Sequence, residues 1–287
     1  MNKGLRLGLI VDCTALAIGF SILAKLSLSG GVSCFQNGKV AMALLATALL
    51  VFPLKALRFY LLLIGRGLPR RKFVLLFCMS SFVSILFPFK IWELFRVYIF
   101  GKALGDYIKG VSIICLDRFV DLLGLLSMMI AGVLMFSWTF EAPLVILLIG
   151  IAGVLVAVYS LLPSFLKYWR MSMLEARSTP GRIAVLEIIK FIHNAYLDVR
   201  QMLQGRFILL VLLSALSWGI EMSSLIVLRS THYSGIDNLF PRYLEASLSQ
   251  IRFLPQLNFI VMSSVVLLLV SVITLVSGIH KKTVTKQ

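Results

Sequence analysis

Long runs of apolar residues, separated by shorter polar segments, occupy most of this 287-residue chain. Six runs are long enough to cross a bilayer, because a spanning helix needs about 20 mainly apolar residues. They lie at residues 5–27, 40–64, 111–136, 142–163, 207–229 and 259–279. The runs are continuous rather than alternating, and only helices and closed barrels satisfy their backbone groups in lipid. The pattern therefore predicts an all-α polytopic membrane protein with about six spanning helices.

A seventh apolar stretch, residues 73–89, is shorter than the others and contains Pro88 near its end. Its length and its proline favour a re-entrant or broken segment over a full span. We expect a second segment of this kind near residues 240–258. The first run carries Asp12 and has no small-x-small cleavage site, so we interpret it as an anchor and not as a signal peptide.

The composition supports the same class of protein. Hydrophobic residues make up 60% of the chain and charged residues 14%, with a mean hydropathy of +0.98. Soluble domains average about 45–50% apolar and about 25% charged residues. The apolar runs are spread from end to end, so we expect residues 1–287 to form a single membrane domain.

The net charge of +16 is distributed unevenly along the chain. If residues 73–89 dip in and return, twenty Lys and Arg residues fall on one side of the membrane and three on the other. Basic loops stay on the cytoplasmic side. We therefore expect a multi-pass protein of the plasma (inner) membrane with cytoplasmic N and C termini. The membrane accounts for the basic charge, and no nucleic-acid partner is expected.

The longest polar segment, residues 164–206, is expected to be a basic cytoplasmic loop. Thr179 and Pro180 form a typical helix start, and apolar residues then recur at three- and four-residue spacing. This pattern predicts an amphipathic helix on the cytoplasmic leaflet, where basic groups gain about 1 kcal/mol each from anionic lipid. An ordinary solvated connector helix fits the pattern equally well.

Cysteine and histidine residues show no pattern typical of a metal site. The four cysteines contain no CxxC motif, and the three histidines are scattered along the chain. We expect neither a metal ion nor a cofactor.

Ionisable side chains inside the apolar zone are the strongest clue to function, since an Asp or Arg at a helix centre costs roughly 2.5–3.5 kcal/mol. They form three clusters with helical spacing, and we expect the clusters to converge. Their members are Lys55 and Arg58; Lys90, Glu93 and Arg96, which follow Pro88; and Asp117, Arg118 and Asp121.

Several Arg and Lys residues with fewer carboxylates suit an anionic lipid head group, because arginine binds phosphate through two donors. The alternative is a buried ion-pair network that only holds the spans together. Lys55 and Arg58, taken alone, would also be able to extend to the inner interface. Glu221, near the middle of its run, is either a pathway residue or a hydrogen-bonded packing residue.

Residues 57–126 resemble a flippase-like family typified by the transmembrane region of lysylphosphatidylglycerol synthase. Its pattern is an arginine in an early span, a proline–basic–x–x–Glu–x–x–Arg stretch, and a later acidic–basic pair with an Asp three residues on. The similarity covers about residues 50–130 and is weaker over 205–230. It implies that the matching residues bind a lipid substrate: Arg58, Lys90, Glu93, Arg96, Asp117, Arg118 and Asp121, with Glu221 on the pathway.

The resemblance implies transfer of an anionic phospholipid or a polyprenyl-phosphate-linked glycolipid between leaflets, without enzymatic activity. No GxxxxGK[ST] loop is present to bind ATP. Two alternatives remain. One is a membrane enzyme that acts on lipid-linked phosphate, with Asp117 or Asp121 as the base. The other is a non-catalytic partner of an envelope-biosynthesis enzyme that modifies glycan or lipid.

Overall fold

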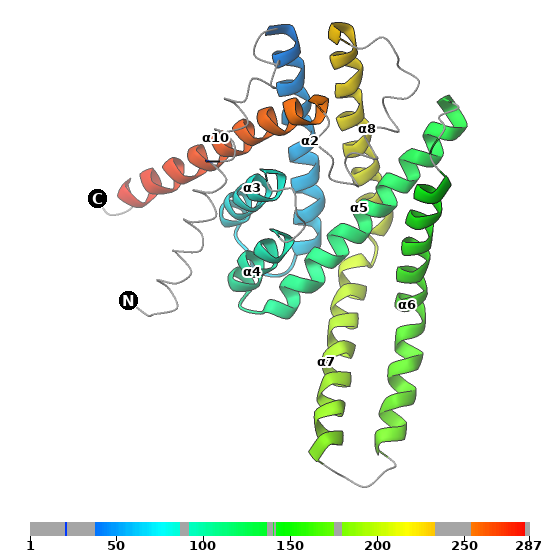
Figure 1. Ribbon diagram of the computed structural model, residues 1–287. Helices are drawn as coiled ribbons and strands as arrows, with labels where there is room; N and C mark the ends of the chain where they lie inside the picture. Colours follow the sequence, from blue (N-terminus) through cyan, green and yellow to red (C-terminus); the bar gives the residue numbers. More distant parts are fainter. Residues whose placement is uncertain are drawn as a thin grey trace.

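The computed structural model describes residues 21, 38–86, 92–136, 140, 142–174, 180–232 and 254–284. Within these residues the chain forms eight helices and no strand, as the apolar runs predicted (Figure 1). The helices are α2 (Gly38–Leu63), α3 (Arg70–Leu86), α4 (Trp92–Leu104), α5 (Tyr107–Phe136), α6 (Ala142–Leu174), α7 (Pro180–Leu203), α8 (Phe207–His232) and α10 (Leu254–Val284).

Helices α2, α5 and α8 form the centre of the molecule. The α2 and α8 helices pack side by side, and α5 crosses α8 obliquely on its way from the α4 corner (Figure 1). The short helices α3 and α4 and the long helix α10 cover the remaining side of α2. The α6–α7 hairpin projects from this bundle.

Two described helical segments, Ala41–Leu63 and Val145–Met173, are long and apolar enough to cross a membrane. The pair Ile183–Leu203 and Phe207–Met222, bent by 73°, adds a third if it is counted as one span. This number is lower than the six predicted. Three features account for the difference. The run 5–27, except residue 21, lies outside the described residues. The α5 helix carries three ionisable side chains in its middle, and the apolar part of α10, Phe259–Thr274, is short.

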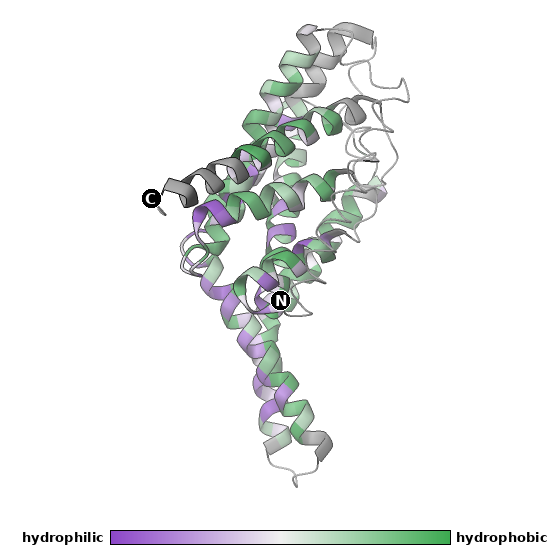
Figure 2. Ribbon diagram, turned by 90° about the vertical axis from the view of Figure 1, so that its left-hand side faces the viewer, coloured by the Kyte–Doolittle hydropathy of each residue, from purple (hydrophilic) through white to green (hydrophobic). Residues whose placement is uncertain are grey.

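The α6 helix is longer than the predicted run 142–163. It continues through Pro163 to Leu174 and takes in the first part of the segment expected to be a loop. The α7 helix covers the region where an amphipathic helix was predicted, and it packs antiparallel to α6. Figure 2 shows polar and apolar positions along this projecting hairpin. Its placement on the cytoplasmic leaflet stays a prediction.

The stretch predicted to be re-entrant at 73–89 corresponds to α3, a helix of 17 residues that packs against α10 and α4. Most of the second predicted segment, residues 240–253, lies outside the described part of the chain, and α10 begins at Leu254. The paths of both segments through the membrane stay predictions.

Small residues let the central helices approach closely. A Cβ atom on Gly110 of α5 would lie 2.9 Å from the Cα atom of Gly101 on α4. A Cβ atom on Gly124 would collide with the Ser214 side chain on α8. These two contacts bring the polar residues of α4, α5 and α8 within reach of each other.

Aromatic packing fills the space between α2, α3 and α4. The Phe59 ring lies 4.8 Å from the Phe100 ring, 6.0 Å from the Phe77 ring and 6.1 Å from the Phe73 ring, measured between centroids. Such pairs stabilise a core by about 0.5–1.5 kcal/mol each beyond the burial of their area. The guanidinium of Arg96 lies 5.0 Å from the centre of the Phe59 ring, which connects this apolar cluster to the charged site.

Candidate functional site

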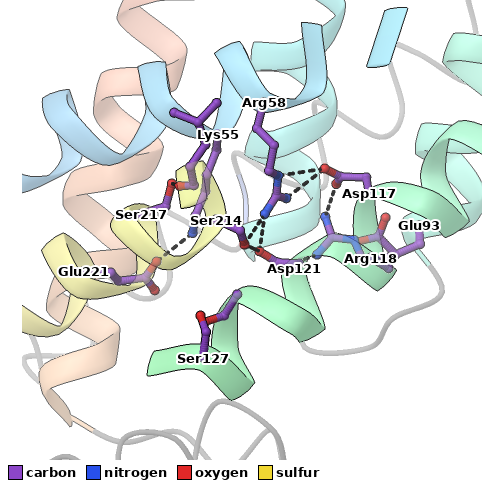
Figure 3. A network of polar contacts seen from close by, with 12 residues as sticks. Lys55, Arg58, Glu93, Asp117, Arg118, Asp121, Ser127, Ser214, Ser217 and Glu221 are labelled. Atoms are coloured by element: carbon purple, nitrogen blue, oxygen red, sulfur yellow. Dashed lines mark hydrogen bonds and ion pairs between the residues drawn. The ribbon is translucent and has the colours of Figure 1, made fainter. Parts of the chain in front are cut away.

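Arg58 of α2 lies at the centre of a buried network of charged residues (Figure 3). Its Nε and Nη2 atoms donate hydrogen bonds to Asp117 Oδ1 at 3.1 and 2.8 Å. Its Nη1 atom donates to Asp121 Oδ1 at 2.5 Å and to Ser214 Oγ at 2.6 Å. The Arg58 side chain is only 3% exposed. Three of these four bonds are 2.8 Å or shorter, so Arg58 links α2, α5 and α8.

Helical spacing explains how each helix presents its polar residues. Asp117 and Asp121 are four residues apart on α5 and therefore share a face. On α8, Ser214 and Glu221 are seven residues apart, close to two full turns. The Ser214 hydroxyl donates to Asp121 Oδ1 at 3.1 Å, which connects the polar face of α8 to that of α5.

Lys55 extends the network along α2. It lies one turn before Arg58 and donates from Nζ to Glu221 Oε2 at 2.6 Å. The same ammonium group lies 5.7 Å from the centre of the Trp218 ring. Lys55 therefore pairs with Glu221 inside the protein. It also lines the same cavity as Arg58.

Arg96 of α4 makes weaker contacts than Arg58. Its Nη1 atom lies 3.5 Å from Glu93 Oε2 and 3.6 Å from Asp117 Oδ2. Its side chain is 4% exposed, and its buried Nε atom has no hydrogen-bond partner among the residues that the structure describes. Leaving a buried donor unsatisfied costs about 1–3 kcal/mol, more for a charged group. Arg96 thus retains donor capacity for an additional acceptor.

Arg118 of α5 is the most accessible cation of the network, with 45% of its side chain exposed. Its guanidinium lies 3.3 Å from Asp117 Oδ2, 3.4 Å from Glu93 Oε1 and 3.6 Å from Asp121 Oδ2. These distances are longer than the 2.7–2.9 Å of strong charge-assisted bonds. The network therefore has a tightly bonded part around Arg58 and a looser part around Arg96 and Arg118.

A polar cavity of about 120 Å³ lies against the network. A water molecule occupies roughly 30 Å³ of liquid, so the cavity has room for several waters or one small ionic group. Four cations and two carboxylates are among the lining residues, and Arg118 is the most exposed of the four cations. The lining residues are Phe52, Lys55, Arg58, Phe77, Ser81, Ser84, Ile85, Arg96, Asp117, Arg118 and Asp121.

An apolar groove of about 590 Å³ runs between α5, α6 and α7. Cys115 and Phe119 of α5 line it, together with Tyr159 of α6 and Tyr196 of α7, whose rings lie 5.2 Å apart. Arg118 follows Cys115 by three positions, less than one helical turn. The same helix therefore presents a charged cavity and an apolar groove on neighbouring faces.

The structure brings six of the predicted binding residues into one network: Arg58, Glu93, Arg96, Asp117, Arg118 and Asp121. Glu221 pairs with Lys55, which lines the same cavity as Arg58. Lys90 lies outside the described residues. Their role in binding a lipid stays a prediction.

Sequence reasoning missed two members of the network, Ser214 and Lys55 in its role as the partner of Glu221. Helical spacing in the sequence indicates both. Lys55 and Arg58 share one face of α2, and Ser214, Ser217 and Glu221 share one face of α8. No group of three His, Cys, Asp or Glu side chains suited to a metal ion occurs within the described ranges.

A family model for the lysylphosphatidylglycerol synthase TM region matches residues 6–234. The chain belongs to this family. The match confirms the predicted resemblance and extends it beyond residues 50–130. No curated protein and no solved structure matches the chain. As a member of the lysylphosphatidylglycerol synthase TM family with long apolar helices, it is a membrane protein related to lipid biosynthesis or translocation.

Proposed function

We propose that this protein transfers an anionic lipid, either a phospholipid or a polyprenyl-phosphate-linked glycolipid, between the two leaflets of a membrane. The observation that carries the proposal is the state of Arg96 and Arg118 at the polar cavity. Arg96 is buried with an Nε atom that has no partner in the described part of the chain, and Arg118 is 45% exposed with long contacts. Both have donors available for phosphate oxygens.

The two parts of the network have different tasks in this mechanism. Arg58 is held by Asp117, Asp121 and Ser214 through short bonds, so it keeps α2, α5 and α8 in place. Arg96 and Arg118 exchange their long contacts with carboxylates for contacts with a phosphate group. Guanidinium groups suit this exchange because each offers two parallel donors to a phosphate.

The apolar groove between α5, α6 and α7 supports an amphiphilic substrate. A lipid with its phosphate at Arg118 has its hydrocarbon chains next to Cys115 and Phe119, where α5 faces apolar surroundings. A groove of about 590 Å³ lies within the range of roughly 300–1,000 Å³ that is usual for ligand sites. Hydrocarbon chains thus stay in an apolar phase while the head group moves through the polar cavity.

We place the protein in the plasma (inner) membrane with both termini in the cytoplasm, and we propose that it performs no chemical conversion. The distribution of Lys and Arg along the sequence supports the orientation. Transfer alone requires a polar path and phosphate ligands, which the cavity and its arginines supply.

Leaflet transfer by the purified protein in vesicles tests the proposal. Vesicles would contain a fluorescent phosphatidylglycerol or phosphatidylcholine, and an impermeant reductant would bleach the probe in the outer leaflet. We expect faster transfer of phosphatidylglycerol and a loss of this advantage in Arg96→Gln and Arg118→Gln. Lys109→Gln, which removes an exposed cation from the same helix, is the matched control and should transfer normally. If phosphatidylglycerol moved between leaflets no faster with the protein than in protein-free vesicles, transfer of this lipid class would be refuted.

A second candidate function is that of a non-catalytic partner of an envelope-biosynthesis enzyme. The observation in its favour is charge balance, because the described network holds four cations and four carboxylates: Lys55, Arg58, Arg96 and Arg118 with Glu93, Asp117, Asp121 and Glu221. A balanced network also suits a purely structural link between helices. The two candidates predict different results for an Asp121 variant.

A further inference from the structure

The helices α6 and α7 form the projecting hairpin (Figure 1). A second cavity, separate from the charged network, lies between them. Its volume is about 610 Å³. It is lined by Pro163, Leu166, Lys167, Arg170, Leu186, Ile189, Lys190, His193 and Asn194. None of these residues takes part in the proposed translocation site, so the inference below does not rest on that function.

The cavity combines an apolar floor with a basic rim. Leu166 and Ile189 are buried at 4% and 8% exposure. Lys167, Arg170 and Lys190 are exposed at the rim. No carboxylate of the described residues lines the cavity. This arrangement matches an amphiphile with an anionic head and an apolar body.

The three cations of the rim make no ion pair within the described part of the chain. Arg58, Arg96 and Arg118, by contrast, each contact at least one carboxylate there. Lys167, Arg170 and Lys190 therefore carry charge that the described protein does not neutralise. Their charge favours an anionic ligand, which would also be held by the Arg170 guanidinium through two donors.

The position of the rim along α6 favours a ligand from the bilayer. Residues 142–166 contain no charged side chain, and 25 helical residues span about 37 Å, slightly more than the hydrocarbon core of about 30 Å. Lys167 is the first charged residue of α6, and the exposed Tyr168 and Trp169 follow it. Tyr, Trp and Lys gather at the level of the lipid head groups.

We propose that this cavity is a binding site for a resident anionic phospholipid, whose phosphate lies at Lys167, Arg170 and Lys190. Its acyl chain lies on the floor of Leu166 and Ile189, between the two helices. This lipid is a structural ligand of the α6–α7 hairpin and not the transported substrate. Each basic residue near an anionic lipid favours its binding roughly fivefold.

Fluorescence quenching at Trp169, next to Arg170, tests the proposal. The other tryptophans would be replaced in the full chain by Trp92→Phe, Trp138→Phe and Trp218→Phe. Vesicles would contain equal amounts of phosphatidylglycerol and phosphatidylcholine, with bromine on the acyl chains of only one of them. We expect much stronger quenching when phosphatidylglycerol carries the bromine, which corresponds to a local enrichment of roughly fivefold or more.

Two triple variants distinguish a specific lipid-binding site from non-specific attraction by surface charge. Replacing Lys167, Arg170 and Lys190 by Gln should remove the preference for phosphatidylglycerol. The matched control, Arg70→Gln with Arg71→Gln and Lys72→Gln, removes three exposed cations from α3 and should retain it. Circular dichroism would verify that both variants keep their helices, which is expected because all six side chains are exposed.

Three results would overturn the assignment to a phospholipid. The first is equal quenching by the two brominated lipids. The second is a preference that survives the Lys167, Arg170 and Lys190 substitutions, or that the control substitutions also abolish. The third is binding of a soluble polyglutamate peptide that needs these three cations, without a lipid preference, because this would assign the cavity to an acidic protein segment.

Discussion

Arg58 and Asp117 are 59 residues apart in sequence, yet Arg58 Nη2 lies 2.8 Å from Asp117 Oδ1. The two side chains are only 3% and 2% exposed. Removing one partner of a buried pair leaves an uncompensated charge and costs about 3–5 kcal/mol, whereas an exposed pair contributes about 0–1 kcal/mol. The location of this pair therefore predicts a large effect on stability.

Replacement of Arg58 by Leu should lower the free energy of unfolding by about 3–5 kcal/mol, because Asp117 and Asp121 lose their closest cation. Thermal unfolding of the purified protein in detergent would measure the change. The matched control is Lys109→Leu, because Lys109 and its partner Asp106 are 44% and 31% exposed and their charged atoms lie 3.7 Å apart, so this change should cost about 0–1 kcal/mol. Equal losses for both variants would show that the Arg58 network does not stabilise the fold.

Replacement of Gly124 by Ala should weaken the contact between α5 and α8. The new Cβ atom would lie 2.5 Å from Ser214 Cβ and 2.9 Å from the backbone nitrogen of Ala215, which is unable to rotate away. Overpacking of this kind costs about 1–3 kcal/mol. Gly150→Ala on α6, where no atom lies within 4 Å, is the control and should be neutral or slightly stabilising. Unfolding temperatures that do not differ between the two variants would contradict the close crossing of α5 and α8.

Lys55 and Glu221 should be energetically coupled, because their charged atoms lie 2.6 Å apart in a largely buried position. In a double-mutant cycle with Lys55→Gln and Glu221→Gln, the interaction energy should be about 0.5–3 kcal/mol. A second cycle that pairs Glu221→Gln with Lys109→Gln serves as the reference. Lys109 lies beside Asp106 at the start of α5, so these two changes should be additive to within about 0.3–0.5 kcal/mol. An additive Lys55–Glu221 pair would rule out their direct interaction.

Replacement of Asp121 by Asn separates the two candidate functions. The substitution removes the charge that Arg58, Ser214 and Arg118 contact, while it keeps the shape of the side chain. If the protein transfers lipid, transfer in vesicles should fall at least about tenfold, which corresponds to about 1.4 kcal/mol in the rate-limiting step. If it is a non-catalytic partner, vesicles with wild-type protein should show no transfer above background, and copurification with an envelope enzyme should be lost in the variant.

Local pattern predicted most helix positions to within a few residues. The apolar run 207–229 corresponds to α8 at Phe207–His232, and the run 40–64 to α2 at Gly38–Leu63. A helix satisfies its own backbone hydrogen bonds, so its extent depends largely on neighbouring residues. The α6 helix differs: the predicted apolar run ends at residue 163, whereas the helix continues to Leu174, and α7 packs alongside it.

The sequence by itself determined the class of this protein, its helical content and the helix face on which each charge lies. Spacing places Asp117 and Asp121 on one side of α5, whatever that side contacts. Only the tertiary structure decided the partners: Asp121 with Ser214, 93 residues away, and Glu221 with Lys55, 166 residues away. Such pairings depend on how closely and at what angle helices cross, which Gly124 permits through its contact with α8. Helical periodicity reports the direction of a side chain and carries no information about the helix it meets.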